Sequence, residues 1–219
     1  PSFGFAECQI PTQPWEPKEP LSCIEVLENP SNHGREKTYR ALKTLMMEWE
    51  EKAFPLIVRL ISHKEPDFQR MALKTFKKIQ TINQDYKEAL ETKAIEALAA
   101  TNSEVRATAA QTLAELGTLI AEQALINLAQ NDNSPSVIAW AATALGEIKS
   151  KAASNSVLLN LLKSPEPQVR YSAVRALGEI NNPVFIKHHL PPLLNDPYIP
   201  IKMAVCETLG NSGDRRFYQ

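Results

Sequence analysis

A segment of about a dozen residues recurs along the chain, and this repetition constrains the fold more than any other feature. Four clear copies follow one another every 32 residues and begin at Val105, Val137, Val169 and Ile201. Two degenerate copies precede them and begin at Lys37 and Phe68. A period of roughly 20–50 residues is typical of a solenoid, in which each unit covers its neighbour. The sequence therefore predicts a stack of about six similar units.

Each copy has the apolar spacing of a helix. In VRYSAVRALGEI, the residues Val169, Ala173, Val174 and Leu177 fall on one face of a helix with roughly 3.6 residues per turn. Further apolar stretches lie between the copies: Phe54–Ile61, Ala89–Leu98, Ile120–Leu128, Val157–Leu162 and Val184–Leu194. The predicted unit is therefore helix A, turn, helix B, turn. The last unit is expected to lack its helix B.

Glycines recur inside these predicted A helices, at Gly146, Gly178 and Gly210. Glycine in a helix interior costs about 1 kcal/mol relative to alanine, so each position needs a reason. Ile148 and Ile180 continue the apolar pattern beyond two of them, which argues against helix C-caps. The sequence predicts contact between crossing helices at these positions.

The charge balance and the cysteines of the chain argue against several classes of function. The chain has 24 Lys and Arg against 25 Asp and Glu, so it lacks the basic excess of proteins that grip nucleic acid phosphates. Three cysteines without a CxxC spacing argue against a disulfide scaffold and against a thiolate zinc site. No apolar run is long enough to span a membrane. We expect a cytoplasmic protein that binds neither nucleic acid nor membrane.

Residues 1–31 differ from the rest of the chain because they contain six of the sixteen prolines. Proline at this density prevents a continuous helix and favours an extended segment. Two interpretations stay open: a poorly ordered tail, or an arm that caps the first repeat with a short helix over Leu21–Leu27. The predicted organisation is an N-terminal arm or cap over 1–31 and a repeat solenoid over 32–219.

Signatures of catalysis and metal binding are absent from the sequence. It contains no glycine-rich phosphate loop, GxSxG elbow, HExxH motif or EF-hand loop. His188 and His189 are adjacent and would point about 100° apart on a helix, which disfavours a shared metal ion. Cys206 is predicted to lie in the core, and Cys8 and Cys23 are candidate exposed thiols. No catalytic residue, metal or cofactor is assigned.

The unit P-x-V-R-x-x-A-x-x-A-L-G-E-I, clearest at Pro167–Ile180, resembles the HEAT repeat. Its A-x-x-A-L-G form is similar to the HEAT-like repeats of the phycobilisome lyase family, from about Lys37 to the C-terminus. The resemblance implies an all-α fold, a right-handed α-solenoid of about six HEAT-like helix pairs whose B helices line a concave protein-binding surface. HEAT-like deoxyhypusine hydroxylases bind iron through His-Glu dipeptides, and none of the four histidines here is followed by Glu. The charge balance disfavours the DNA-binding members.

Nine residues are predicted to contact a partner. Seven are polar and fall into two columns on the aligned B helices: Arg59, Asn127 and Asn160 in one, and Lys93, Gln123, Ser156 and His188 four residues earlier. The others, Trp140 and Tyr171, are non-repeating aromatics on A helices, where gap-filling and binding both stay open. Recurring polar side chains suit a protein surface or peptide better than an apolar ligand.

The outer surface of the A helices changes sign along the chain. Lys74 and Lys78 lie on an early copy, and the position of Lys78 is taken later by Glu115, Glu147 and Glu179. A solvated face and a surface that steers a charged protein both stay open.

The favoured function is a non-catalytic interaction scaffold or adaptor that binds a partner protein on its concave B-helix surface. The alternative, implied by the resemblance, is a bilin lyase or bilin-lyase-like chaperone acting on phycobiliproteins. The partner would then be a phycobiliprotein or a second HEAT-like chain, and any enzymatic activity would be of the phycobilin lyase type.

Overall fold

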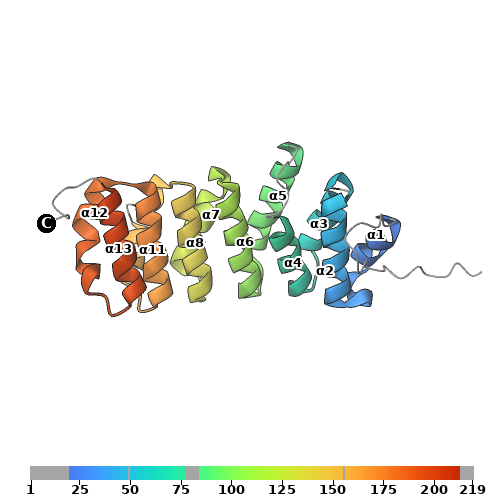
Figure 1. Ribbon diagram of the computed structural model, residues 1–219, viewed down its shortest axis with the longest axis horizontal. Helices are drawn as coiled ribbons and strands as arrows, with labels where there is room; N and C mark the ends of the chain where they lie inside the picture. Colours follow the sequence, from blue (N-terminus) through green and yellow to red (C-terminus); the bar gives the residue numbers. More distant parts are fainter. Residues whose placement is uncertain (1–19, 49, 77–83, 155, 213–219) are drawn as a thin grey trace, which may run out of the picture. The chain divides into compact units, whose positions relative to one another are not determined.

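The computed structural model describes residues 20–48, 50–76, 84–154 and 156–212 (Figure 1). Every element within those ranges is a helix, which confirms the predicted all-α class. The chain divides into two compact units, Pro1–Lys93 and Ala94–Gln219. None of the helices in the described ranges is long and apolar enough to cross a membrane.

The described part of the first unit begins with a short helix packed on the first repeat. Its helices are α1 (Pro20–Glu28), α2 (Pro30–Glu48), α3 (Glu50–Ile61), α4 (Pro66–Phe76) and most of α5 (Gln84–Ala97). α1 contacts α2 and α3 and buries Val26 and Leu27, so the helix expected over Leu21–Leu27 is present. The preceding part of the predicted arm, residues 1–19, lies outside the described residues, and so does Cys8 with its expected exposure.

Cys23 is fully buried, and its expected exposure is wrong. It precedes Val26 and Leu27 by three and four residues, so it shares their buried face of α1. The helical spacing therefore explains why Cys23 is buried.

The second unit alternates A and B helices as predicted. Its A helices are α6 (Ser103–Leu116), α8 (Pro135–Glu147), α11 (Pro167–Ile180) and α13 (Ile199–Asn211). Its B segments are α7 (Glu122–Asn131), α9 (Lys151–Ser154) with α10 (Val157–Leu161), and α12 (Pro183–His189), joined by the 3-10 turns η1 (Leu119–Ala121) and η2 (Pro191–Asn195). Along the chain α6 packs on α8, α8 on α11 and α11 on α13 (Figure 1). Residues 213–219 lie outside the described residues, so the missing last B helix stays a prediction.

The predicted apolar face of α11 forms core. Val169, Ala173, Val174 and Leu177 are all buried. Cys206 on α13 is exposed, so its predicted place in the core is wrong. The equivalent residues of α8 and α11, Ala142 and Val174, are buried, whereas α13 is the last helix that the structure describes, so no later helix within the described residues covers Cys206.

Two of the helix glycines sit where A helices approach closely. A Cβ on Gly146 would lie 2.6 Å from the Cα of Ala176, and one on Gly178 would lie 3.0 Å from Oγ1 of Thr208. Both distances are too short for an alanine without movement of a neighbour. The predicted contact between crossing helices is therefore confirmed at these two positions.

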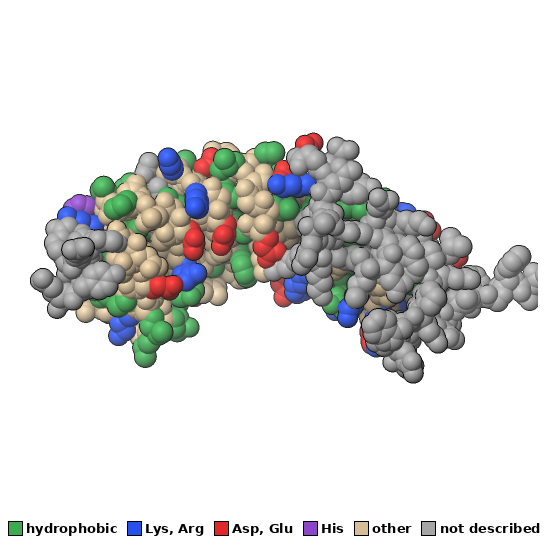
Figure 2. All heavy atoms as spheres, turned by 45° about the horizontal axis from the view of Figure 1, so that its top comes forward, with side chains coloured by type: hydrophobic (Ala, Val, Ile, Leu, Met, Phe, Trp, Pro, Cys, Tyr) green, Lys and Arg blue, Asp and Glu red, His purple; other side chains and the backbone are tan. Residues whose placement is uncertain are grey.

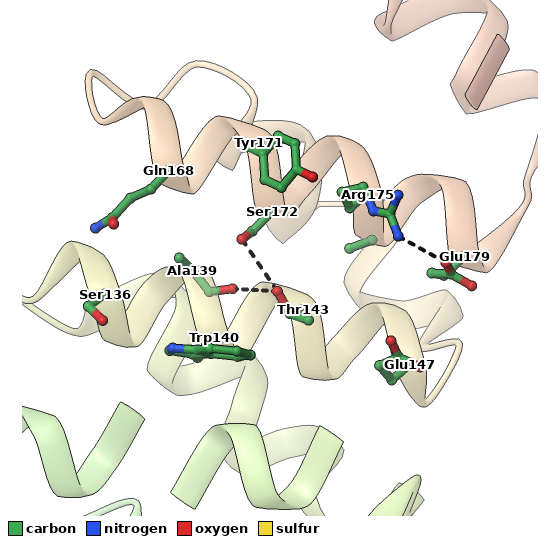
Figure 3. A pocket seen from close by; sticks show the side chains of 11 residues that line it. Ser136, Ala139, Trp140, Thr143, Glu147, Gln168, Tyr171, Ser172, Arg175 and Glu179 are labelled. Carbon is green, nitrogen blue, oxygen red and sulfur yellow. Dashed lines mark hydrogen bonds and ion pairs between the residues drawn. The ribbon is translucent and has the colours of Figure 1, made fainter. Parts of the chain in front are cut away.

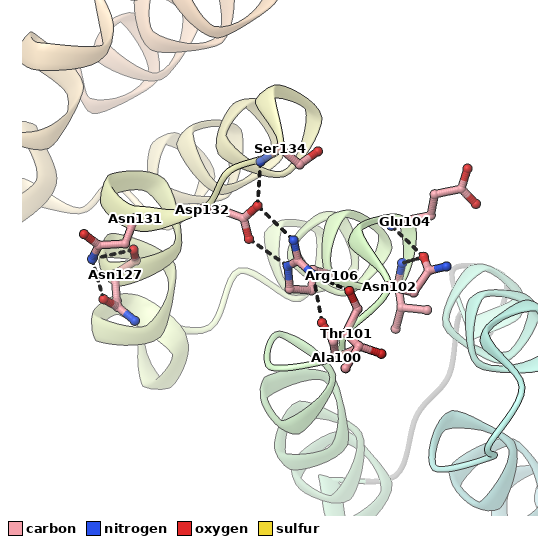
Figure 4. Close-up of polar contacts among 10 residues, drawn as sticks. Ala100, Thr101, Asn102, Glu104, Arg106, Asn127, Asn131, Asp132 and Ser134 are labelled. Carbon is pink, nitrogen blue, oxygen red and sulfur yellow. Dashed lines mark hydrogen bonds and ion pairs between the residues drawn. The ribbon is translucent and has the colours of Figure 1, made fainter.

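Two arginine–aspartate clamps hold the loops of the second unit, and Figure 4 shows the first of them. Arg106 on α6 donates from Nε and Nη2 to the carboxylate of Asp132 at 2.7 and 3.0 Å. Its Nη1 donates to the carbonyl oxygens of Ala100 and Thr101, both at 2.9 Å. Asp132 also accepts the backbone N–H of Ser134 at 2.8 Å, just before α8. The clamp thus ties α6 to the loop before it and to the loop that starts the next A helix.

The second clamp repeats this geometry 64 residues later. Arg170 on α11 donates to the carboxylate of Asp196 at 2.8 and 3.0 Å and to the carbonyls of Ser164 and Pro165. Asp196 accepts the backbone N–H of Tyr198 at 2.9 Å. A bidentate pair with such bonds is stronger than an ordinary neutral hydrogen bond.

The clamps shift the pKa values of both partners. Burial alone would raise the pKa of Asp132, but the hydrogen bonds from Arg106 and from backbone N–H groups outweigh it and lower that pKa. The hydrogen bond from Arg170 lowers the pKa of Asp196, and burial only partly opposes it. Both carboxylates are therefore held in the charged form.

Candidate partner-binding surfaces

The polar residues predicted on the B helices of the second unit are exposed. They are Gln123, Asn127, Ser156, Asn160 and His188. A cavity of about 470 Å³ lies between α7 and α10, lined by Asn160, Asn131 and Lys163 among others. Asn131 Nδ2 donates to Oδ1 of Asn127 at 2.7 Å, which places Asn127 beside the same cavity (Figure 4). The structure thus brings Asn127 and Asn160 to one polar surface.

The other two polar predictions lie in the first unit. Arg59 is exposed on α3, and Lys93 is half-buried on α5. The two predicted columns are therefore divided between the two units.

The histidine pair on α12 is exposed. His188 and His189 both face solvent, and the His189 ring centroid lies 6.0 Å from that of Phe185. Among the described residues, no group of three or more His, Cys, Asp or Glu side chains is placed to hold a metal ion.

Trp140 and Tyr171 lie together in a groove on the A-helix face (Figure 3). The groove lies between α8 and α11 and has a volume of about 360 Å³. Trp140 is half-buried on α8, and Tyr171 is 37% exposed on α11. The hydroxyl oxygens of Thr143 and Ser172 lie 3.3 Å apart and join the two helices. The sequence placed each aromatic on an A helix, but only the structure shows that they line one groove.

Carboxylate side chains lie in this groove and on the equivalent surface of the preceding A helix. Glu147 and Glu179 line it, and the equivalent Glu115 on α6 is exposed too. Figure 2 shows several acidic side chains near one another on the surface of the molecule. Lys74, from the predicted basic surface, is exposed on α4, and Lys78 lies outside the described residues.

Arg175 on α11 links neighbouring carboxylates on the same face. Its guanidinium lies 3.3 Å from Oε2 of Glu207 on α13 and 4.0 Å from Oε1 of Glu179 (Figure 3). Neither Arg175 nor the two clamp arginines were predicted from the sequence as functional residues. The signal for the clamps was present, since Arg106 and Arg170 share a repeat position and so do Asp132 and Asp196.

Comparison with known proteins accounts for the repeat. A family model of HEAT repeats matches residues 91–157 and 155–219, which together make up more than half of the chain. The chain belongs to the HEAT-repeat family. A search of curated proteins found no match to it.

Solved structures share the HEAT-repeat fold at low sequence identity. The complex of CpcE and CpcF of phycocyanin lyase from Nostoc is 21% identical, with a TM-score of 0.63, over 97% of this chain and 82% of that one. An engineered protein is 22% identical, with a TM-score of 0.62, over 87% and 98%. A designed armadillo repeat protein in complex with the peptide (KR)4 is 18% identical, with a TM-score of 0.64, over 89% and 99%. These matches support the solenoid fold class and agree with the resemblance to phycobilisome lyase repeats.

Proposed function

We propose that this HEAT-repeat chain is a non-catalytic interaction scaffold or adaptor that binds a partner protein on its B-helix surface. The observation that carries this proposal is the polar cavity between α7 and α10, beside which Asn127 and Asn160 are exposed. Two of the similar structures contain a bound protein or peptide, namely the CpcE–CpcF complex and the complex with (KR)4.

The chemistry of this surface suits a polypeptide. An asparagine side chain offers both donors and acceptors, so it can pair with the backbone amide or with a polar side chain of a partner. The cavity also contains Gln130, Lys163 and Ser164, which add hydrogen-bonding groups of the same kind. Ordered water commonly completes such polar interfaces without making them weak.

The remaining predicted contacts extend the proposal. Gln123, Ser156 and His188 are exposed on the second unit, and Arg59 and Lys93 are proposed contacts of the first. We also propose a cytoplasmic location, because neither Cys23 nor Cys206 forms a disulfide.

The test starts from a partner captured from cell extract, identified by mass spectrometry and then purified. Calorimetric titration would compare the wild-type chain with Asn127→Ala/Asn160→Ala, which we expect to raise the Kd at least about tenfold. The thermal midpoint should barely change, because exposed substitutions usually stay within about 0.5 kcal/mol. The matched control is Asn133→Ala/Asn195→Ala, two exposed asparagines that do not line the cavity. A loss of binding in the control alone would contradict the proposal.

The second candidate is a bilin lyase or bilin-lyase-like chaperone acting on a phycobiliprotein, with or without a second HEAT-like chain. It is favoured by the match to the phycocyanin lyase complex, which covers 97% of this chain. Visible absorbance after mixing the chain with an open-chain bilin and an apo-phycobiliprotein separates the two candidates. A spectrum equal to that of the mixture without the chain would exclude this second function.

A further inference from the structure

The groove between α8 and α11 combines aromatic rings with small side chains. Trp140 on α8 and Tyr171 on α11 both line it (Figure 3), and the small residues Ala139 and Ala176 belong to the same lining. Its volume of about 360 Å³ is at the small end of ligand sites and has room for a few side chains. The groove therefore fits a short segment of a polypeptide.

The charged residues of the groove indicate which kind of polypeptide segment suits it. Glu147 and Glu179 contribute two carboxylates to its lining, and Arg175 is the one cationic residue among the described residues that line it. That arginine also lies 3.3 Å from Glu207, so its charge is shared between two carboxylates. No ion pair of Glu147 occurs among the described residues. An excess of exposed carboxylates is complementary to a cationic partner.

We propose that the α8–α11 groove binds a segment of a partner protein that carries a lysine or arginine. The cationic group would approach Glu147 and Glu179, and its aliphatic stem would cover Trp140 and Tyr171. Lysine and arginine bury their stems on apolar surface, and their charges are attracted to aromatic faces. The inference rests on the proposed interaction function and adds a second surface of stated chemistry.

The test is a titration of the full chain into a fluorescein-labelled hexapeptide that alternates arginine and alanine, followed by fluorescence anisotropy. We expect saturable binding that weakens as salt screens the exposed charges. The hexapeptide that alternates glutamate and alanine should not bind. Glu147→Gln/Glu179→Gln should raise the Kd of the arginine peptide about tenfold, the combined effect of two exposed ion pairs.

A matched control changes the net charge equally at another place. Glu104→Gln/Glu166→Gln alters two exposed carboxylates near the starts of α6 and α11, outside the groove lining, and should change the Kd less than about twofold. Equal losses in the two double variants would overturn the proposal, because net charge alone would explain them.

The aromatic contact needs its own variants. Tyr171→Ala should raise the Kd about threefold or more, since it removes stacking area for the cationic side chain. Tyr198→Ala removes an exposed tyrosine that does not line the groove and should leave the Kd unchanged. Both tyrosines are exposed, so circular dichroism should show unchanged folding. Equal effects of the two substitutions would overturn the proposed aromatic contact.

Other occupants would give different results, and each would overturn the inference. A second copy would appear as a dimer in sedimentation equilibrium that Glu147→Gln/Glu179→Gln dissociates. The chain's own C-terminal segment would compete with the peptide, so Arg215→Gln/Arg216→Gln would tighten peptide binding. Failure of the arginine peptide to bind overturns the groove inference alone, because Asn127→Ala/Asn160→Ala is tested with a purified partner on the B-helix surface.

Discussion

The α8–α11 and α11–α13 junctions occupy equivalent places in successive repeats, yet different contacts hold them. A Cβ on Gly146 would meet the backbone of Ala176 at 2.6 Å, whereas one on Gly178 would meet the side chain of Thr208 at 3.0 Å. Backbone can give way only if the whole helix shifts. The α8–α11 junction is therefore the more tightly specified of the two at this position.

The polar contacts, in contrast, are stronger at the α11–α13 junction than at the α8–α11 junction. The Arg170–Asp196 clamp ties α11 to the loop before α13. At the matching positions α8 has Ile138, and the loop before α11 has Ser164, whose hydroxyl oxygen accepts the backbone N–H of Glu166 at 3.2 Å. The unclamped junction has the larger cavity, about 360 Å³ against about 170 Å³. Both junctions have a glycine where the A helices cross. Among the described residues of these two junctions, the clamp is present only at the α11–α13 junction, so the α8–α11 junction packs without one.

The largest loss of stability is expected for a substitution in the core of α11, the helix that both junctions share. Leu177 is 1% exposed in α11, so Leu177→Ala should cost roughly 2–5 kcal/mol of unfolding free energy by leaving a cavity. Urea denaturation measures the loss. Leu119→Ala, at an exposed position of η1, is the control and should stay within about 0.5 kcal/mol. A loss below about 1 kcal/mol for Leu177→Ala would contradict the assigned repeat register.

Removing the clamp should weaken the α11–α13 junction next most strongly. Asp196 is only 5% exposed at its side chain, so Arg170→Ala leaves a buried carboxylate without its cation and should cost about 3 kcal/mol. Arg175→Ala on the same helix removes an exposed ion pair and should cost less than about 1 kcal/mol. Equal losses for the two arginines would mean that the clamp does not stabilise the junction.

The glycine contacts should separate the two junctions directly. Gly146→Ala should cost about 2 kcal/mol, because overpacking against the Ala176 backbone outweighs the gain in helix propensity. Gly178→Ala should lie within about 1 kcal/mol of wild type, because the Thr208 side chain can turn aside. Thermal unfolding of both variants checks the order. The reverse order would contradict the closer approach of α8 and α11.

Acid should produce the smallest effect, through the carboxylates of the clamps. The pKa of Asp196 is lowered in the folded state, so its contribution to stability is present above the ordinary carboxyl pKa and is lost as pH falls through the lowered value. Below about pH 4 the unfolding free energy of wild type should therefore fall more steeply than that of Asp196→Asn. Urea denaturation at several pH values measures both slopes. If the unfolding free energies of the two proteins fell equally steeply with pH, the clamp would not be a source of acid sensitivity.

Much of the fold could be predicted from the sequence because its determinants are local and repeated. The spacing of Val169, Ala173 and Leu177 defines a helix face whatever that face meets, and it is buried as expected. The glycines at 146 and 178 were predictable for the same reason, since an unfavourable helix residue at a repeated position indicates a close contact.

The candidate surfaces could be predicted only in part. Asn127 and Asn160 were assigned to one column by repeat spacing, and the structure brings both to the α7–α10 cavity. The α8–α11 groove was not predicted, because its aromatics come from different repeat positions and share no period.

The sequence by itself determined the helical repeat, the alternation of A and B helices and the positions where helices must approach. Only the tertiary structure decided that Trp140 and Tyr171 share a groove, that Arg106 reaches Asp132 across 26 residues and that Cys206 is exposed. The physical reason is that periodicity records what a single helix needs. Pairing and exposure depend instead on which neighbouring element covers each side chain, and that neighbour is fixed only when the chain folds.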